Sequence, residues 1–391
     1  MKAEQRNIFR LLVRGQINHF GNVIFDYANR LLISRHPVSA PFLMMLYQSS
    51  ESLAQLIFNL LGGHVADFHN RKRILLVTDL IAALATFVLF LVYNPENIWA
   101  LILVNTLLAI LYSFNSPAYR AVIRDLLSKT AIFQYNSLSK LIAEIVSVAS
   151  PLLALVVVSQ LGFRYAMLIN SFSFLVSAWC EHRFEILHKT ESSKSKLGQG
   201  LKDGLVYIYK DKQIFYVLVT AALINFLDAI YTFYLPFTPI FSGFDNIYAY
   251  ILIAQSVGSI LASLIVTWFG KRELGPNHYF YFLIIGSLAW IGLGFVGRSQ
   301  LLILVLCGIF SGSVTIFNIF FMSHIQTSIQ PNMLGRVFSI IFTMVGIFVP
   351  LGSMVASWIN LQNWSVFMYI GFAQLILCFG VLRLFTKMAK S

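Results

Sequence analysis

Twelve apolar stretches of about 20 residues each constrain the fold of this chain more than any other feature. A helix needs about 20 consecutive apolar residues to cross a bilayer core roughly 30 Å thick, and inside lipid every backbone polar group must find its partner within the protein. The stretches are 11–33, 41–63, 74–93, 98–118, 138–160, 163–182, 214–238, 248–269, 278–297, 300–322, 337–359 and 364–385. The sequence therefore predicts an all-α integral membrane protein with twelve transmembrane helices.

Composition argues against a soluble protein. Hydrophobic residues make up 58% of the 391 residues and charged residues 11%, whereas soluble domains average roughly 45–50% apolar and about 25% charged residues. The three cysteines lie in apolar stretches without disulfide or metal spacing, and no phosphate-binding loop is present. We therefore expect no cofactor, no metal and no ATP-driven transport. The net charge of +12 is not evidence for nucleic-acid binding, because basic residues also flank membrane spans. We therefore expect no nucleic-acid partner.

The distribution of Lys and Arg orients the spans. Twelve spans place both termini on one side, and 22 of the 28 Lys and Arg residues fall on that side. Three lie on the opposite side and three within the apolar stretches. Because short cytoplasmic loops carry an excess of Lys and Arg, both termini are expected in the cytoplasm.

The longest polar segment, 185–212, divides the spans six and six. Within it, apolar residues at helical spacing predict a short amphipathic helix on the membrane surface. These residues are Leu201, Leu205, Ile208 and Tyr209. We expect an N-terminal six-helix bundle at 1–184, this linker at 185–212, and a C-terminal six-helix bundle at 213–391. A faint repeat supports two halves, since 132–137 and 334–339 stand at corresponding entries to a span.

The loop between the second and third spans carries the strongest motif, which runs from 63 to 73 and reads G-H-V-A-D-F-H-N-R-K-R. Gly63 would let the end of the second span approach a neighbouring helix closely. Asp67 lies at the membrane boundary beside Arg71, Lys72 and Arg73, where charge pairs can lock or release a conformation. The alternative interpretation is an ordinary basic loop that obeys the charge rule.

This stretch resembles the signature of the major facilitator superfamily, G-x-x-x-D-R-x-G-R-R/K. The matching residues are Gly63, Asp67, Arg71 and Lys72. Phe68 stands where the family has Arg, and Asn70 where it has Gly. Within the superfamily the chain resembles the macrolide-efflux and enterobactin-exporter branch of drug:proton antiporters. The supporting segments are Ser116-Pro117-Ala118, Asn136-Ser137-Leu138 and Gly335-Arg336-Val337.

The resemblance implies two six-helix bundles that work by alternating access. It also implies that spans one, two, four, five, seven, eight, ten and eleven line the cavity. One departure bears on the direction of transport, because antiporters of this superfamily carry Gly-Pro in span five where this sequence has Ser150-Pro151.

Carboxylates inside the apolar stretches are the candidates for proton coupling. A charged side chain at mid-bilayer costs at least about 2.5–3.5 kcal/mol, so its presence calls for a partner or a function. Glu51, Asp228 and Asp26 lie deepest, and Glu51 and Asp228 rank first, because Arg30 stands one turn from Asp26. Each of the three has an alternative structural role, as an ion pair for Asp26 and as a hydrogen-bonded carboxyl for the others. Asp79 is expected to support the loop motif, which we interpret as a conformational switch.

Polar stripes predict the wall of a substrate cavity. The first span presents Arg14, Asn18, Asn22, Asp26 and Arg30 at successive i+4 steps, which places them on one helix face. The complete set of cavity candidates outside the proton and motif residues is Asn18, Asn22, Arg30, Gln48, Gln55, Asn225 and Gln255.

Together these features predict a secondary active transporter of the bacterial cytoplasmic membrane, and not an enzyme. We expect proton-coupled efflux of an amphipathic small molecule such as a drug, a macrolide-like compound or a secreted metabolite. The expected partners are that small molecule, protons and the lipid bilayer, with a monomeric protein. The alternatives are a nutrient importer, a lipid flippase of the same fold, and a non-transporting membrane receptor or scaffold.

Overall fold

The computed structural model describes residues 2–37, 39–187, 209, 212–269, 276–296, 299–329, 334–359 and 363–388. All regular structure in these ranges is helical, and twelve of the helices have at least 18 residues. The prediction of an all-α, twelve-helix protein is confirmed. The chain forms two compact units, Met1–Lys194 (unit 1) and Ser195–Ser391 (unit 2). Apart from Tyr209, the predicted amphipathic helix lies outside the described residues.

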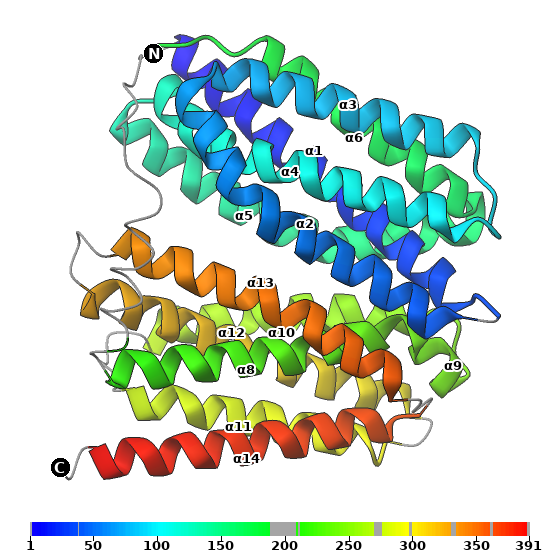
Figure 1. The fold of residues 1–391 in the computed structure, drawn as a ribbon, viewed down its shortest axis with the longest axis vertical. Coiled ribbons are helices and arrows are strands. Elements are labelled where there is room, and N and C mark those ends of the chain that lie inside the picture. The colour runs from blue at the N-terminus through cyan, green and yellow to red at the C-terminus, as the bar shows by residue number, and fades with distance from the viewer. Residues whose placement is uncertain are drawn as a thin grey trace. The chain divides into compact units, whose positions relative to one another are not determined.

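Each unit contains six of the long helices, coloured along the chain in Figure 1. Unit 1 consists of α1 (Lys2–Ser34), α2 (Ala40–Phe68), α3 (Arg71–Leu91), α4 (Ile98–Leu126), α5 (Lys129–Val156) and α6 (Phe163–His182), with η1 (Val157–Leu161) after α5. Unit 2 consists of α8 (Lys212–Tyr234), α10 (Ile247–Phe269), α11 (Pro276–Leu293), α12 (Gln300–Ser328), α13 (Leu334–Trp358) and α14 (Ser365–Met388). The short η2 (Leu235–Phe237) and α9 (Thr238–Ser242) follow α8, where Pro236 and Pro239 interrupt the helix.

The two units pair their helices in the same way. In unit 1, α1 packs against α5 and α6, α2 against α4, and α3 against α4 and α6. In unit 2, α8 packs against α13 and α14, α10 against α12, and α11 against α12 and α14. Reading α8 as the counterpart of α1 makes these principal pairings the same in both units. The faint sequence repeat therefore corresponds to a repeated six-helix arrangement.

Helix ends follow from local sequence. Asn70, Asn97 and Ser128 precede α3, α4 and α5, and the side chain of each accepts a hydrogen bond from a backbone N–H of the first turn. Such caps satisfy amide groups that have no partner within the helix.

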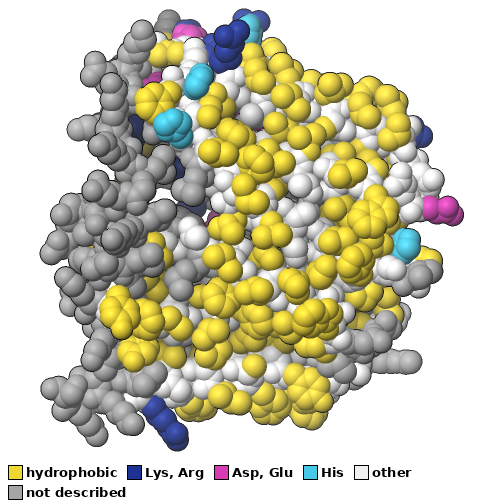
Figure 2. Space-filling model, in the orientation of Figure 1, with side chains coloured by type: hydrophobic (Ala, Val, Ile, Leu, Met, Phe, Trp, Pro, Cys, Tyr) yellow, Lys and Arg dark blue, Asp and Glu magenta, His cyan; other side chains and the backbone are white. Residues whose placement is uncertain are grey.

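Several helices have the length and apolarity of membrane spans. Seven meet both criteria among the described residues, and α11 and α13 contain shorter apolar stretches. Large apolar side chains also point outward from both units, as the yellow surface in Figure 2 shows. Exposed apolar area of this extent is typical of a lipid-facing surface.

Glycines bring helices into close contact at corresponding places in the two units. A Cβ atom added at Gly62 of α2 would lie 2.0 Å from the backbone oxygen of Ser113 in α4. One added at Gly258 of α10 would lie 2.1 Å from the oxygen of Gly308 in α12. The prediction for Gly63 is wrong, because a Cβ there meets no described atom within 4 Å. Adjacent helical residues point about 100° apart, so Gly62 faces α4 and Gly63 does not.

Candidate functional site

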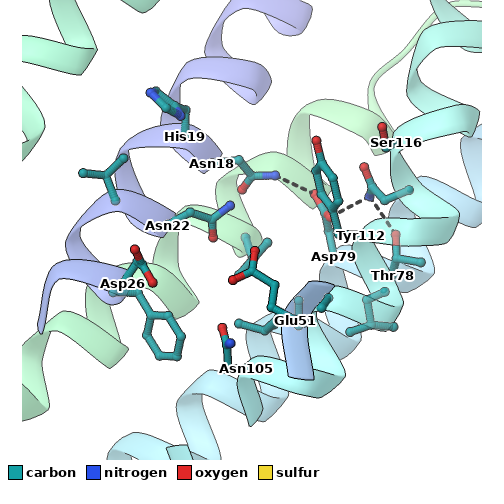
Figure 3. A pocket seen from close by; sticks show the side chains of 18 of the residues that line it. Asn18, His19, Asn22, Asp26, Glu51, Thr78, Asp79, Asn105, Tyr112 and Ser116 are labelled. Carbon is teal, nitrogen blue, oxygen red and sulfur yellow. Dashed lines mark hydrogen bonds between the residues drawn. The ribbon is translucent and has the colours of Figure 1, made fainter. Parts of the chain in front are cut away.

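Unit 1 contains an open cavity of about 660 Å³. Its wall is formed by side chains from α1, α2, α3, α4 and α6 (Figure 3). Sites for drug-sized molecules have volumes of roughly 300–1,000 Å³, so the cavity is large enough for one. Apolar contact is available from Phe25, Leu108, Leu111, Tyr112 and Phe174.

The polar stripe of α1 forms one wall, as the i+4 spacing predicts. All five of its residues, Arg14, Asn18, Asn22, Asp26 and Arg30, line the cavity. The neutral members lie between the two arginines, so charge is concentrated toward the ends of the stripe and amides toward its middle.

At one end of the stripe, Asp26 and Arg30 form an ion pair. The Arg30 Nε atom lies 2.8 Å from Asp26 Oδ2, and Tyr47 of α2 donates its hydroxyl to Asp26 Oδ1 at 3.1 Å. The pair is therefore fixed on α1 with one oxygen also held by α2. Among the described residues, Asp26 thus has a cation in direct contact.

Glu51 projects from α2 into the cavity toward Asn22 and Asp26 (Figure 3). The amide of Gln55 lies 3.4 Å from its Oε1 atom, and Asn105 of α4 lies beside it. Within the part of the chain that the structure describes, Glu51 forms no ion pair; Arg30 acts on it only at longer range and Asp26 opposes it. A carboxylate in this environment is poorly compensated.

At the other end, Arg14 joins two carboxylates from different helices. Its Nε donates to Glu181 Oε1 of α6 at 2.9 Å, and its Nη2 lies 3.8 Å from Asp79 Oδ2 of α3. Relative exposure is 6% for Arg14, 3% for Asp79 and 0% for Glu181. The guanidinium also stacks 4.1 Å from the ring centroid of Tyr119, a cation–π contact.

Neutral donors complete the coordination of Asp79. Asn115 of α4 donates to Oδ1 at 2.9 Å, Asn18 of α1 donates to Oδ2 at 3.2 Å, and Ser177 of α6 also donates to Oδ2. Three helices thus converge on one carboxylate. Asp79 was expected to support the loop motif, but the partners that the described residues provide lie on α1, α4 and α6.

Arg71 and Lys72 of the loop motif contact residues at the end of unit 1 at which α1 begins. Arg71 Nη1 lies 2.9 Å from both carboxylate oxygens of Asp125 at the end of α4. Lys72 donates to the backbone oxygen of Phe184 at 2.9 Å, and the Arg73 backbone N–H is capped by Asn70. The side chain of Asp67 lies outside the described part of the chain, so its proposed switch role stays a prediction.

An exposed ion cluster ties the same end to the segment after α6. Glu185 accepts hydrogen bonds from Arg6 at 2.7 Å and Arg10 at 3.0 Å. These bonds, that from Arg6 first, hold the pKa of Glu185 below its ordinary value. Asn7 donates to the backbone oxygens of Leu126 and Glu185.

The remaining candidates lie apart from this cavity. Gln48 is buried on α2 and does not line it. In unit 2, Asn225 donates to the Ala221 backbone oxygen of its own helix at 2.7 Å, and Gln255 donates to the Tyr231 hydroxyl at 2.8 Å. Asp228 is half-buried on α8.

Sequence reasoning missed Glu181, Asn115, Asn105 and Tyr47. Glu181 stands in the last turn of its helix, where a charge is ordinary at a membrane boundary. The available signal was Arg14, since a guanidinium inside a span requires a carboxylate partner.

Comparison with known proteins identifies a matching family, similar sequences and similar structures. Residues 17–353 match the family model of the Major Facilitator Superfamily. Macrolide efflux protein A of Streptococcus pyogenes is 24% identical over 355 residues, covering 84% of this chain and 83% of the relative. The Staphyloferrin A transporter of Staphylococcus aureus is 23% identical over 313 residues, covering 77% of each. Among solved structures, an inward-facing bacterial homologue of the human lysosomal transporter Spinster aligns with a TM-score of 0.77 at 13% identity over 98% of both chains.

Proposed function

The chain belongs to the Major Facilitator Superfamily, and on this premise we propose that it exports cationic amphipathic molecules in exchange for protons. As a member of that family it is a multi-pass membrane transporter and not an enzyme. Export direction, proton coupling, cargo class and cytoplasmic termini are the proposed parts. We also propose that the linker at 185–212 joins two bundles that open alternately to the two sides of the membrane.

The balance of charge in the cavity supports a cationic cargo. The wall carries three carboxylates, Asp26, Glu51 and Asp79, against the two cations Arg14 and Arg30. Both cations are already held, Arg30 by Asp26 and Arg14 by Asp79 and Glu181. Glu51 therefore offers an uncompensated negative charge beside aromatic and aliphatic contact surface, which suits a molecule with one positive group and an apolar body.

Glu51 is the observation that carries the proposal, because a proton and a cationic cargo would compete for its carboxylate. With cargo absent, a proton neutralises Glu51; on arrival of cargo, the proton leaves and the cation replaces it. Such competition links the two fluxes without any nucleotide. Asp228 is the second proton candidate in unit 2, and Asp26–Arg30 is assigned to recognition or gating.

Efflux as the direction is supported by the macrolide efflux relatives, which cover most of the chain at 24% identity. A panel of cationic, neutral and anionic amphipathic compounds in everted membrane vesicles tests direction and cargo together. Accumulation of cationic compounds that needs an imposed pH gradient is the expected result. Accumulation that ignores the gradient, or that occurs only in right-side-out vesicles, would contradict the proposal.

The Glu51→Gln variant sharpens the same assay. It should lose gradient-driven accumulation, and any gradient-free exchange that remains should need a higher concentration of cationic cargo, because a neutral amide neither carries the coupled proton nor pairs with the cation. Glu96→Gln is the matched control, since Glu96 is an exposed glutamate in the connection between α3 and α4. Equal gradient-driven transport by Glu51→Gln and the parent would remove Glu51 from the mechanism.

A further inference from the structure

The cluster of Arg14, Asp79 and Glu181 contains two carboxyl groups and one guanidinium, all buried. If both carboxyls were ionised, the interior of unit 1 would hold one uncompensated negative charge. Burying an unpaired charge is far more costly than burying a neutral carboxyl group. One bound proton removes the imbalance and leaves a single ion pair on Arg14.

Hydrogen bonding distinguishes the two carboxyls. Asp79 accepts donors at both oxygens, from Asn115 at Oδ1 and from Asn18 and Ser177 at Oδ2. Such bonds favour the ionised form of a carboxyl. Glu181 accepts a bond only at Oε1, from Arg14, and its fully buried Oε2 accepts no hydrogen bond from the described residues. An oxygen without donors is the position at which a proton is best held.

The other titratable and charged groups around Glu181 leave this assignment intact. Arg14 on α1 and Asp79 on α3 face it directly. Tyr119 on α4 stacks on Arg14, and its hydroxyl lies 2.5 Å from that of Tyr135 on α5. On α1, Arg10 is held by Glu185 and by the backbone oxygen of Arg183. Cys180, the preceding residue of α6, is also buried.

We propose that Glu181 is a proton-binding site outside the cavity wall, which communicates with the cavity through Arg14. Arg14 and Asp79 line the cavity and Glu181 does not. When Glu181 holds a proton, Asp79 is the negatively charged partner of Arg14 within the cluster. When the proton leaves, Arg14 is shared between two carboxylates, and the cavity wall gains negative character beside Asn18 and Asn115. This rests on the proposed function and adds a further proton site to Glu51 and Asp228, but occupancy of Glu181 by a proton does not depend on which cargo is moved.

Infrared spectroscopy of the full chain in lipid nanodiscs tests the assignment without cargo. Protonated carboxyl groups absorb apart from carboxylates, so the parent at neutral pH should show a protonated-carboxyl band that decreases by one group in Glu181→Gln. Glu185→Gln is the matched control, four residues away on the same segment and paired with Arg6 and Arg10. It should leave the band unchanged.

A second variant keeps the test decisive if Glu181→Gln does not fold. In Asp79→Asn the cluster holds one carboxyl and one guanidinium, so Glu181 should ionise and the same band should decrease by one group although Glu181 is still present. A protonated-carboxyl band of equal size in the parent, Glu181→Gln and Asp79→Asn would overturn the proposal and leave the cluster as an ion network alone. A decrease of one group on adding Na⁺ at constant pH, present in the parent and absent in Glu181→Gln, would also overturn it, since the site would then bind a metal cation in place of a proton.

Discussion

Units 1 and 2 share the same principal helix pairings, yet corresponding groups of four helices enclose different chemistry. In unit 1, the helices α1, α3, α4 and α6 contribute Arg14, Asp79, Asn115 and Glu181. Their counterparts in unit 2, α8, α11, α12 and α14, contribute a cluster that includes Leu218, Phe280, Phe317 and Cys378. One bundle buries an ion network where the other buries hydrocarbon.

Unit 2 adds a second aromatic cluster on the same four helices. The rings of Trp290 and Phe310 stack with centroids 4.0 Å apart, and Tyr231 lies 5.0 Å from Trp290. Phe367 of α14 closes the group at 5.4 Å from Tyr231. Aromatic pairs contribute about 0.5–1.5 kcal/mol beyond their buried area, and these four residues include no carboxyl or basic group.

The difference shows that the repeated fold does not require a polar interior. Because unit 2 packs the same helix pairs without buried ion pairs among its described residues, the charges of unit 1 are an addition to the architecture. Buried ion networks are weak contributors to stability and costly when broken. Their position beside the cavity agrees with a role in sensing protons and cargo.

Removing Arg14 should lower the stability of the protein more than any other change proposed here. Arg14→Met leaves Asp79 and Glu181 facing each other without a cation, and breaking a buried ion pair in this way costs about 3–5 kcal/mol. We expect a large loss of folded protein on thermal unfolding in detergent. A triple change to Arg14→Leu, Asp79→Asn and Glu181→Leu imitates unit 2 and should recover most of that stability. No recovery would mean that the fold of unit 1 depends on the ions themselves.

Truncating an aromatic side chain is the corresponding change in unit 2. Phe367→Ala removes a fully buried ring and should cost about 3 kcal/mol through the cavity left behind. Because no titratable group is removed, the loss should stay constant across neutral and mildly acidic pH, whereas that of Arg14→Met should shrink as the carboxyls take up protons. Parallel pH dependence of the two variants would remove the distinction between the units.

The paired glycines give a test with a built-in control. Gly62→Ala drives a Cβ into the Ser113 backbone, and overpacking of this kind costs about 1–3 kcal/mol. Gly63→Ala meets open space and should be neutral or stabilising, since Ala favours a helix by about 1 kcal/mol over Gly. Thermal unfolding of the two variants separates them, and equal behaviour would show that α2 does not approach α4 through Gly62.

The smallest effect is expected at the exposed ion cluster outside the bundle. Since Arg6 and Arg10 depress the pKa of Glu185, its contribution is present above the pKa of an unfolded glutamate, about 4.3, and is lost as pH falls through the lower folded value. Glu185→Gln should therefore remove a small stabilisation at neutral pH and change little at strongly acid pH. High salt should reduce the difference. A larger effect in acid than at neutral pH would contradict the assignment.

Much of the fold and of the cavity wall follows from sequence periodicity. Apolar runs of span length locate the helices, and the i+4 spacing of α1 identifies one cavity wall, because both patterns depend only on helix geometry. Partners between helices depend on rotation and depth, which the spacing within one helix does not report. Asp79 stands eight residues after Arg71, about 12 Å along α3, so it joins Arg14 and not the loop. Glu181 and Gly62 were missed for the same reason.

The most direct test of the account measures protons released when cargo binds to purified protein in weakly buffered solution. A cationic compound accepted in the vesicle assay is added, and a pH-sensitive dye reports release. We predict about one proton released per cargo bound by the parent and by Asp228→Asn in unit 2, and none by Glu51→Gln, because ligand binding that displaces a proton must release it. Equal release by the parent and Glu51→Gln, with loss in Asp228→Asn, would contradict the claim that unit 1 holds the site where proton and cargo compete.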